Sequence, residues 1–276
     1  MNEALLRSGA IVTADELQEM PYAAREKIRG DLVCPSCRAD AYFIREARNG
    51  RRACFGARPH GEDCELASVG TDDGGGAALD ETDERINAGD VFQLEPNRSS
   101  NIRHVHHDPT LEPGTGSAVR YTRRGSSIAR ISSLSMDRLL RQLALREGFR
   151  RSNTMLILPD DTRGRVKTLC THMTDAVTRD VGRRRIYWGT IRFPRLRPDG
   201  AWLNTGRRIS PSISIGQADL NALLQAKGLE DVDDLSGSYF AFLGPLRSGP
   251  TGKLLLFVND LEWFAVRPHS EDSEVN

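Results

Sequence analysis

Four of the five cysteines of this chain fall within one short N-terminal window. Cys34 and Cys37 bracket a CPSC motif, and Cys54, His60 and Cys64 follow within thirty residues. A CxxC turn presents two thiolates from one tight knuckle, and zinc completes its tetrahedron with two further nitrogen or sulfur ligands from a separate loop. The window therefore predicts a zinc-binding module, because so small a unit cannot bury enough apolar surface to fold alone.

Five candidate side chains compete for the four ligand positions. We favour Cys34, Cys37, His60 and Cys64, because the HxxxC spacing can present its two ligands from one turn and a proline stiffens the approach to His60. In that arrangement Cys54 is a nearby thiol outside the ligand set. The alternative is that Cys54 takes the place of His60 or Cys64.

The expected cellular compartment also favours metal over a disulfide. No signal-peptide pattern opens the chain and no run of about 18 apolar residues occurs, so we expect neither secretion nor a membrane span. The predicted location is the cytoplasm, where thiols are kept reduced and clustered cysteines are ligands. Cys170 lies far downstream and is interpreted as an ordinary core residue.

Charge is segregated along the chain although it sums to zero. The 38 Lys and Arg residues balance the 38 Asp and Glu residues, yet residues 65–117 are acidic, residues 118–210 are strongly basic and residues 211–276 are acidic again. Most of the positive charge is arginine, whose guanidinium group binds phosphate through two parallel hydrogen bonds. This distribution favours a polyanionic partner for the basic region.

Composition and hydrophobic periodicity divide the chain into four parts. The fold class that we predict is α+β. The parts are a zinc ribbon (1–67), a flexible acidic linker rich in Gly and Pro (68–127), an OB-like small β-barrel with helices (128–269) and a disordered acidic tail (270–276).

Local signals place individual elements within these parts. Thr13 or Asp15 should cap a helix that follows a short strand, and Asn49-Gly50 should turn a hairpin that begins near residue 39. Ser135 should cap a helix over 136–148. The remaining expectations are strands at 154–158, 186–193, 201–204, 213–215, 238–243, 253–258 and 262–266, and helices at 171–181 and 217–227.

Residues 10–66 resemble the N-terminal zinc-binding module of CoiA-type competence proteins. The resemblance rests on Cys34, Pro35, Cys37, the segment 55–60 with its His60, and Cys64. Those relatives often carry a histidine near the position of Cys54, and no nuclease core like theirs follows here. The resemblance therefore implies a zinc module and no enzymatic activity.

The segment 183–197 interleaves arginines with aromatic residues. In an extended strand such a pattern can set stacking surfaces for bases beside phosphate-binding side chains. We therefore predict binding of nucleic acid, with single-stranded DNA or RNA favoured. The predicted contacts are Arg183, Arg184, Arg185, Tyr187, Trp188, Arg192 and Arg195.

Two other classes of function stay open at this point. Asp160 and Asp161, with Lys167, are an imperfect match to the carboxylates of a metal-dependent nuclease. A protein-interaction adaptor, for instance in a mobile element or in antiviral (phage) defence, would use the same ribbon and basic surface to bind a protein partner. The run at His104, His106 and His107 has no assigned role, because a catalytic metal site needs rigid support that a Gly- and Pro-rich linker lacks.

Overall fold

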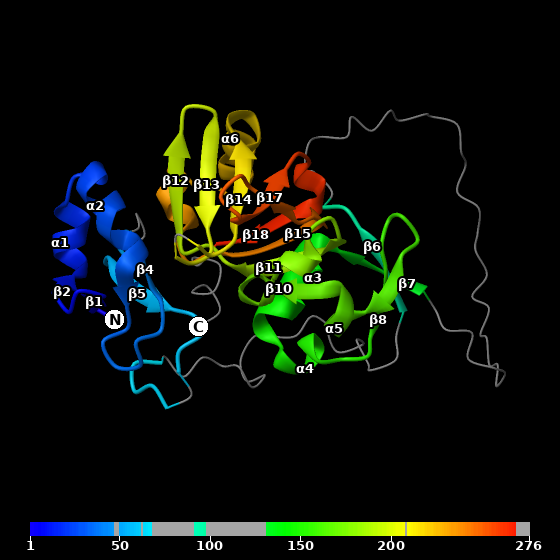
Figure 1. The fold of residues 1–276 in the computed structure, drawn as a ribbon, viewed down its shortest axis with the longest axis horizontal. Coiled ribbons are helices and arrows are strands. Elements are labelled where there is room, and N and C mark those ends of the chain that lie inside the picture. Colours follow the sequence, from blue (N-terminus) through cyan, green and yellow to red (C-terminus); the bar gives the residue numbers. More distant parts are fainter. Residues whose placement is uncertain (47–49, 62, 68–90, 98–130, 208, 269–276) are drawn as a thin grey trace, which may run out of the picture.

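The computed structural model of the chain describes residues 1–46, 50–61, 63–67, 91–97, 131–207 and 209–268. These residues form a mixed α+β fold in which an N-terminal module lies beside a larger body of sheets and helices (Figure 1). The three histidines at 104, 106 and 107, most of the predicted linker and the predicted tail lie outside the described residues.

The N-terminal module combines a three-stranded antiparallel sheet of order β2-β1-β3, a β4-β5 hairpin and short helices. Its elements are β1 (Glu3–Leu6), β2 (Ile11–Thr13), α1 (Ala14–Glu19), α2 (Tyr22–Ile28), the 3-10 turn η1 (Arg29–Asp31), β3 (Leu32–Val33), β4 (Ala41–Ile44) and β5 (Cys54–Ala57).

Local sequence signals explain how this module begins. Thr13 is the N-cap of α1: its hydroxyl accepts a hydrogen bond from the Glu16 N–H, and the Glu16 carboxylate accepts one from the Thr13 N–H. In the predicted hairpin, Phe43 of β4 lies opposite Phe55 of β5, with ring centroids 5.7 Å apart. The helix cap and the pairing of the two hairpin strands are confirmed, while Asn49 of the predicted turn lies outside the described residues.

A second sheet, of order β7-β6-β8-β9, includes a strand from within the predicted linker. Residues 91–95 form β6, which pairs in parallel with β7 on one side and with β8 on the other. The linker prediction is therefore wrong for these residues. Its alternating apolar pair, Phe92 and Leu94, is buried in the core that also contains Leu134 and Leu156 of the neighbouring strands. The strands are β6 (Val91–Glu95), β7 (Ile131–Ser135), β8 (Met155–Ile157) and β9 (Arg163–Arg165).

Helix α3 (Met136–Leu145) covers this sheet and packs on the next one. Ser135 caps it as predicted, since the Ser135 hydroxyl accepts a hydrogen bond from the Arg138 N–H at 3.4 Å. Leu139, Leu140 and Leu143 form its buried face. The short helices α4 (Glu147–Arg150) and α5 (Val166–Leu169) follow in the chain.

Two further sheets complete the body. A four-stranded sheet has the order β10-β11-β15-β18, and a five-stranded sheet has the order β12-β13-β14-β17-β16. The first contains β10 (Cys170–His172), β11 (Arg184–Thr190), β15 (Tyr239–Pro245) and β18 (Phe264–Arg267). The second contains β12 (Phe193–Arg197), β13 (Gly200–Asn204), β14 (Ser212–Gly216), β16 (Arg247–Ser248) and β17 (Leu254–Val258), with α6 (Gln217–Ala226) beside it. The 3-10 turns are η2 (Met173–Asp175), η3 (Thr178–Asp180), η4 (Val232–Leu235) and η5 (Leu261–Trp263).

The sheet that contains β11 and β15 is buried on both faces. Successive residues of these strands point to opposite sides, so Ile186 and Trp188 join the core under α3, whereas Tyr187 and Phe240 join the core under the five-stranded sheet. A strand buried on both faces is apolar at nearly every position. That burial explains the apolar runs at residues 186–189 of β11 and 239–244 of β15.

The predicted OB-like barrel does not form in the described residues. The strands expected to share one barrel are divided between two open sheets: β12, β13, β14 and β17 in one, and β11, β15 and β18 in the other. β14 pairs in parallel with β17, and no strand pairing closes either sheet among the described strands. Within the same residues, no helix combines the length and apolarity that a membrane crossing requires.

Candidate metal centre

The first half of the centre is the turn that follows β3. The Cys34 N–H donates to the Ala39 carbonyl at 2.8 Å, and the Arg38 N–H donates to the Cys34 carbonyl at 3.0 Å. Arg38 has a φ of 59°, the left-handed conformation that favours glycine. This tight turn brings Cys34 and Cys37 onto one side of the backbone.

The second half follows β5 and includes His60 and Cys64. The Cys64 N–H donates to the Gly61 carbonyl at 3.1 Å and closes a small turn. A Cβ added at Gly61 would lie 3.1 Å from the Cys37 Cβ, so the two halves are in close contact here. Glycine at 61 allows the second turn to approach the first knuckle.

The four favoured side chains meet in space. The ligand atoms of Cys34, Cys37, His60 and Cys64 all lie within 4.8 Å of one another. The Cys34 and Cys64 Sγ atoms are 3.7 Å apart, and the Cys37 Sγ lies 3.5 Å from the His60 Nδ1. In a tetrahedral zinc site with Zn–S of about 2.3 Å and Zn–N of about 2.0–2.1 Å, these separations would be about 3.8 and 3.6 Å. The spacing of the side chains therefore suits one metal ion.

The other two cysteines lie outside this set. Cys54 is the first residue of β5, opposite Ile44 of β4, and Cys170 is the first residue of β10. Burial alone strongly raises the pKa of the Cys170 thiol, as expected of a core cysteine. In the described part of the chain, this is the one group of His, Cys, Asp and Glu side chains close enough to hold a metal.

The thiols of the centre titrate differently. Burial raises the pKa of Cys34. Burial acts in the same direction on Cys64, but hydrogen bonds from the Leu66 backbone and from the Cys37, Ser36 and Cys34 side chains outweigh it and lower the Cys64 pKa to about 6. Cys64 is therefore a thiolate at neutral pH, the form that binds metal.

Buried arginines attach the module to the rest of the protein. Arg192, just before β12, is only 4% exposed; its Nη2 donates to the Leu32 and Ala41 carbonyls at 3.1 and 2.6 Å, and its Nη1 lies 2.7 Å from the Asp40 carboxylate. Desolvation lowers the Arg192 pKa to about 10 against the opposing effect of Asp40, so the guanidinium stays charged at neutral pH. The partners are the residues that flank the metal knuckle.

These contacts correct the predicted role of Arg192. A guanidinium buried among protein carbonyls and a carboxylate has no surface for a phosphate. Arg195, also predicted to bind phosphate, is two-thirds exposed, with its Nε 3.0 Å from the Glu26 carboxylate of α2. Both arginines thus contact the N-terminal module.

The three consecutive arginines at the start of β11 lie at the surface near carboxylates. Arg183 and Arg185 approach Asp180 at 3.7 and 3.5 Å, and Arg184 approaches Asp160 at 3.5 Å. Asp180 is buried, whereas both members of the Arg184–Asp160 pair are exposed. An exposed pair contributes about 0–1 kcal/mol, so Arg184 can exchange its partner at little cost.

The aromatic residues of β11 do not form the predicted stacking surface. Tyr187 is fully buried and Trp188 is 7% exposed, on opposite faces of the same strand. The Tyr187 hydroxyl donates to the Arg183 carbonyl at 3.2 Å, and the Arg150 guanidinium lies 5.0 Å from the Trp188 ring centre. The prediction is wrong for both rings, because neighbouring layers cover each face of the sheet.

The carboxylates considered for nuclease chemistry are not gathered into a site. Asp160 and Asp161 form the exposed turn between β8 and β9, where Asp160 Oδ1 accepts a hydrogen bond from the Thr162 N–H at 3.2 Å. Asp160 otherwise faces Arg184.

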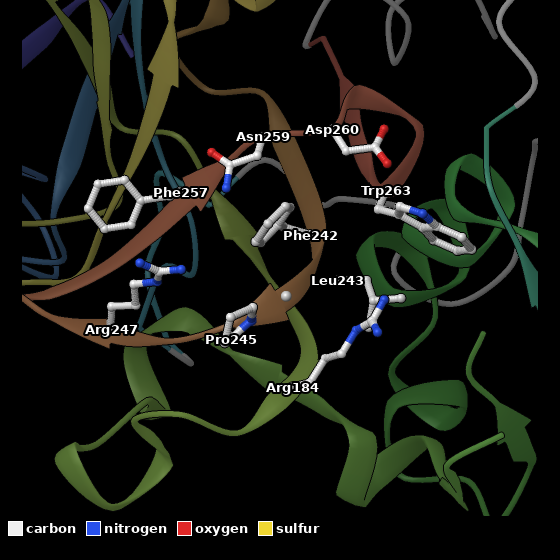
Figure 2. Close-up of a pocket in the computed structure, with 10 residues that line it drawn as sticks. Arg184, Phe242, Leu243, Pro245, Arg247, Phe257, Asn259, Asp260 and Trp263 are labelled. Atoms are coloured by element: carbon white, nitrogen blue, oxygen red, sulfur yellow. The ribbon is translucent and has the colours of Figure 1, made fainter. Parts of the chain in front are cut away.

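A hollow of about 360 Å³, which the sequence did not predict, opens where β15, β16, β17 and η5 meet (Figure 2). Aromatic rings, two arginines and an asparagine line it, and Arg184 is its one predicted residue. Its other residues come from the last quarter of the chain, outside the basic segment that directed the prediction. The alternating aromatic residues of β15, Phe240 and Phe242, and the single Phe257 of β17 were the available signal.

No protein-family model, curated protein or solved structure matches this chain. The fold and the site alone define its class: an α+β protein with a Cys3His cluster suited to one metal ion in its N-terminal module.

Proposed function

We propose that the chain is a zinc-containing protein that binds single-stranded nucleic acid, with zinc in a structural role. The observation that carries the zinc assignment is the convergence of Cys34, Cys37, His60 and Cys64. Three thiolates and an imidazole are a donor set typical of zinc. Four protein ligands complete the tetrahedron and leave no position for a substrate, as in structural sites.

The role of the metal follows from where its ligands lie. The knuckle is continuous with β3 and β4, whose carbonyls at Leu32 and Ala41 receive the buried Arg192. A metal ion that fixes the knuckle would therefore also fix the two carbonyls through which the module contacts the rest of the protein. Zinc would supply much of the folding free energy of this part, on the order of 10 kcal/mol.

Exposed arginines on one side of the body support nucleic-acid binding. Arg163 and Arg165 are exposed, and they lie two residues apart on the edge strand β9, so their side chains share one face. Arg184 lies close by, because it approaches Asp160 in the turn that leads into β9. Guanidinium groups grouped in this way suit a chain of phosphates.

Metal analysis of the purified protein tests the zinc assignment. We expect one zinc ion per chain, lost in Cys37→Ser and in Cys64→Ser. Cys54→Ser is the matched control and should keep the ion, because Cys54 lies outside the ligand set. Full zinc content in the Cys37 and Cys64 variants would overturn the assignment.

Fluorescence anisotropy with labelled single strands tests the binding. Affinity should fall with salt, with a slope of about −0.7 for each neutralised phosphate. The double variant Arg163→Ala/Arg165→Ala should reduce both the affinity and the slope. Arg151→Ala, which removes an 81% exposed arginine that is paired with Glu147 and is not part of β9, should have a smaller effect. Absence of salt-dependent binding by the wild-type protein would refute the proposal.

A further inference from the structure

The hollow beside Arg184 has rigid aromatic walls. Phe242 of β15 is 5% exposed and stacks edge-to-face on Phe264, with centroids 6.2 Å apart and an interplanar angle of 71°. Phe257 of β17 is held in the same manner by Trp202, at 6.5 Å and 67°. These neighbours fix both rings. Phe242 is buried and forms the floor of the hollow, whereas Phe257 is only partly buried and can contact a flat apolar group.

The third aromatic wall is Trp263, whose position is fixed by the capped 3-10 turn η5. Trp263 is the last residue of η5, and Asp260 caps that turn by accepting a hydrogen bond from the Glu262 N–H at 2.8 Å. Trp263 is half-buried and packs on the core under α3, while it also lines the hollow. Figure 2 shows Trp263 and Phe257 on opposite sides of the cavity, with Phe242 between them.

Polar and cationic groups complete the lining. Arg184 and Arg247 are exposed residues that both line the hollow, and Arg247 lies over the Phe257 ring at 5.6 Å from its centre. Asn259 is exposed and lines the hollow, so the donors and the acceptor of its amide are accessible to a ligand. The volume of about 360 Å³ is at the lower end of the range for small-molecule sites, about 300–1,000 Å³.

We infer that this hollow receives one nucleobase of a bound single strand, an inference that rests on the proposed function. The partly buried rings of Phe257 and Trp263 can stack on a base, the Asn259 amide can pair with its polar edge, and the two arginines can hold the flanking phosphates. An aliphatic ligand would make no use of the amide or of the arginines, and an inorganic anion would leave the aromatic walls unused. The combination therefore favours a base joined to phosphate.

Binding to a strand of abasic residues distinguishes the contribution of the base from that of the phosphates. We expect the wild-type protein to bind an oligothymidine more tightly than the matched abasic strand, by about 5- to 100-fold. Trp263→Ala and Asn259→Ala should weaken binding of the oligothymidine and leave binding of the abasic strand unchanged. Arg247→Ala should weaken both, and Arg151→Ala is the control for loss of one exposed charge.

Folding of the variants is verified independently. Asn259 is exposed, so its variant should keep the wild-type free energy of unfolding, and Trp263→Phe provides a conservative ring if Trp263→Ala unfolds. Quenching of tryptophan fluorescence by the oligothymidine should be present in the wild type and reduced in Trp263→Phe. Equal affinity of the wild-type protein for both strands would overturn the base pocket and leave phosphate binding intact. Failure to bind either strand would overturn the proposed function as well.

Discussion

Arg29 donates a hydrogen bond from its Nη1 to the Asp233 carboxylate at 2.7 Å, and each side chain is only 4% exposed. The two residues are 204 positions apart and join the N-terminal module to η4. Arg25 also approaches Asp233, at 3.7 Å, and Arg29 donates to the Pro194 carbonyl. The metal module and the body therefore share a buried charged interface.

Removing one member of this pair should destabilise the protein strongly. Asp233→Ala leaves Arg29 and Arg25 as buried cations without that carboxylate, and we expect a loss of about 3–5 kcal/mol in the free energy of unfolding. Urea titration measures it. Glu147→Ala, which breaks an exposed pair with Arg151, should cost no more than about 1 kcal/mol. Equal effects of the two variants would contradict a buried role for the Asp233 pair.

Gly61→Ala should weaken metal binding without removing a ligand. The new methyl group would lie 3.1 Å from the Cys37 Cβ, so the second turn must move away from the knuckle. We expect affinity for zinc to fall on the order of tenfold, the effect of disturbing groups that orient metal ligands. Competition with a chromophoric chelator measures it. Gly148→Ala, with no atom within 4 Å of the new Cβ, is the control and should keep wild-type affinity.

Gly200→Ala should damage the hairpin between β12 and β13. Gly200 has a φ of 143°, and a Cβ there would lie 2.0 Å from the Ile215 carbonyl oxygen, so the sheet must shift. A loss of more than about 3 kcal/mol in unfolding free energy is expected. The control is Gly216→Ala, at the cross-strand partner of Gly200. A Cβ at Gly216 would meet only Asp219, at 4.0 Å, so this variant should lose about 1 kcal/mol or less of unfolding free energy. A mild effect at Gly200 would disagree with this pairing.

Stability should fall in mild acid because of His172. Burial lowers the pKa of this imidazole below its ordinary value of 6.5; Asp175 opposes the shift and Arg150 adds to it. The unfolded chain therefore takes up a proton near pH 6.5 while the folded protein does not. The free energy of unfolding therefore keeps its full value, as far as His172 is concerned, above about pH 6.5. It declines as the pH falls toward the lower pKa of the folded protein, by at most about 1.4 kcal/mol per pH unit.

Comparing the wild type with His172→Gln isolates this effect. Both proteins carry the same other histidines and the same metal ligands, so subtracting their unfolding free energies at each pH removes those contributions. The difference should be constant above pH 7 and should shrink between pH 6.5 and 5. A difference that does not change with pH would mean that His172 titrates normally in the folded protein.

Short-range signals were sufficient for many elements of the fold. Thr13 and Ser135 cap their helices through residues three positions away, and the turn before Gly200 joins neighbouring strands. The ligand set was also predictable, because CxxC and HxxxC spacings each place two ligands on one turn. The separations of the four ligand atoms then favour His60 over Cys54.

Long-range packing decided the rest. In the sequence, Arg192 and Tyr187 belong to a segment of arginines and aromatic residues typical of a nucleic-acid-binding surface, yet both are buried. Arg192 is buried because it donates to carbonyls that lie 151 and 160 positions away in the chain. Tyr187 is buried because two cores enclose β11. Residues 91–95 form a strand only because β7 and β8 supply partners on both sides. The sequence by itself determined where turns, caps and metal ligands lie, since those depend on neighbours in the chain. Which charged and aromatic side chains reach solvent depends on contacts between distant segments, and only the tertiary structure decided it.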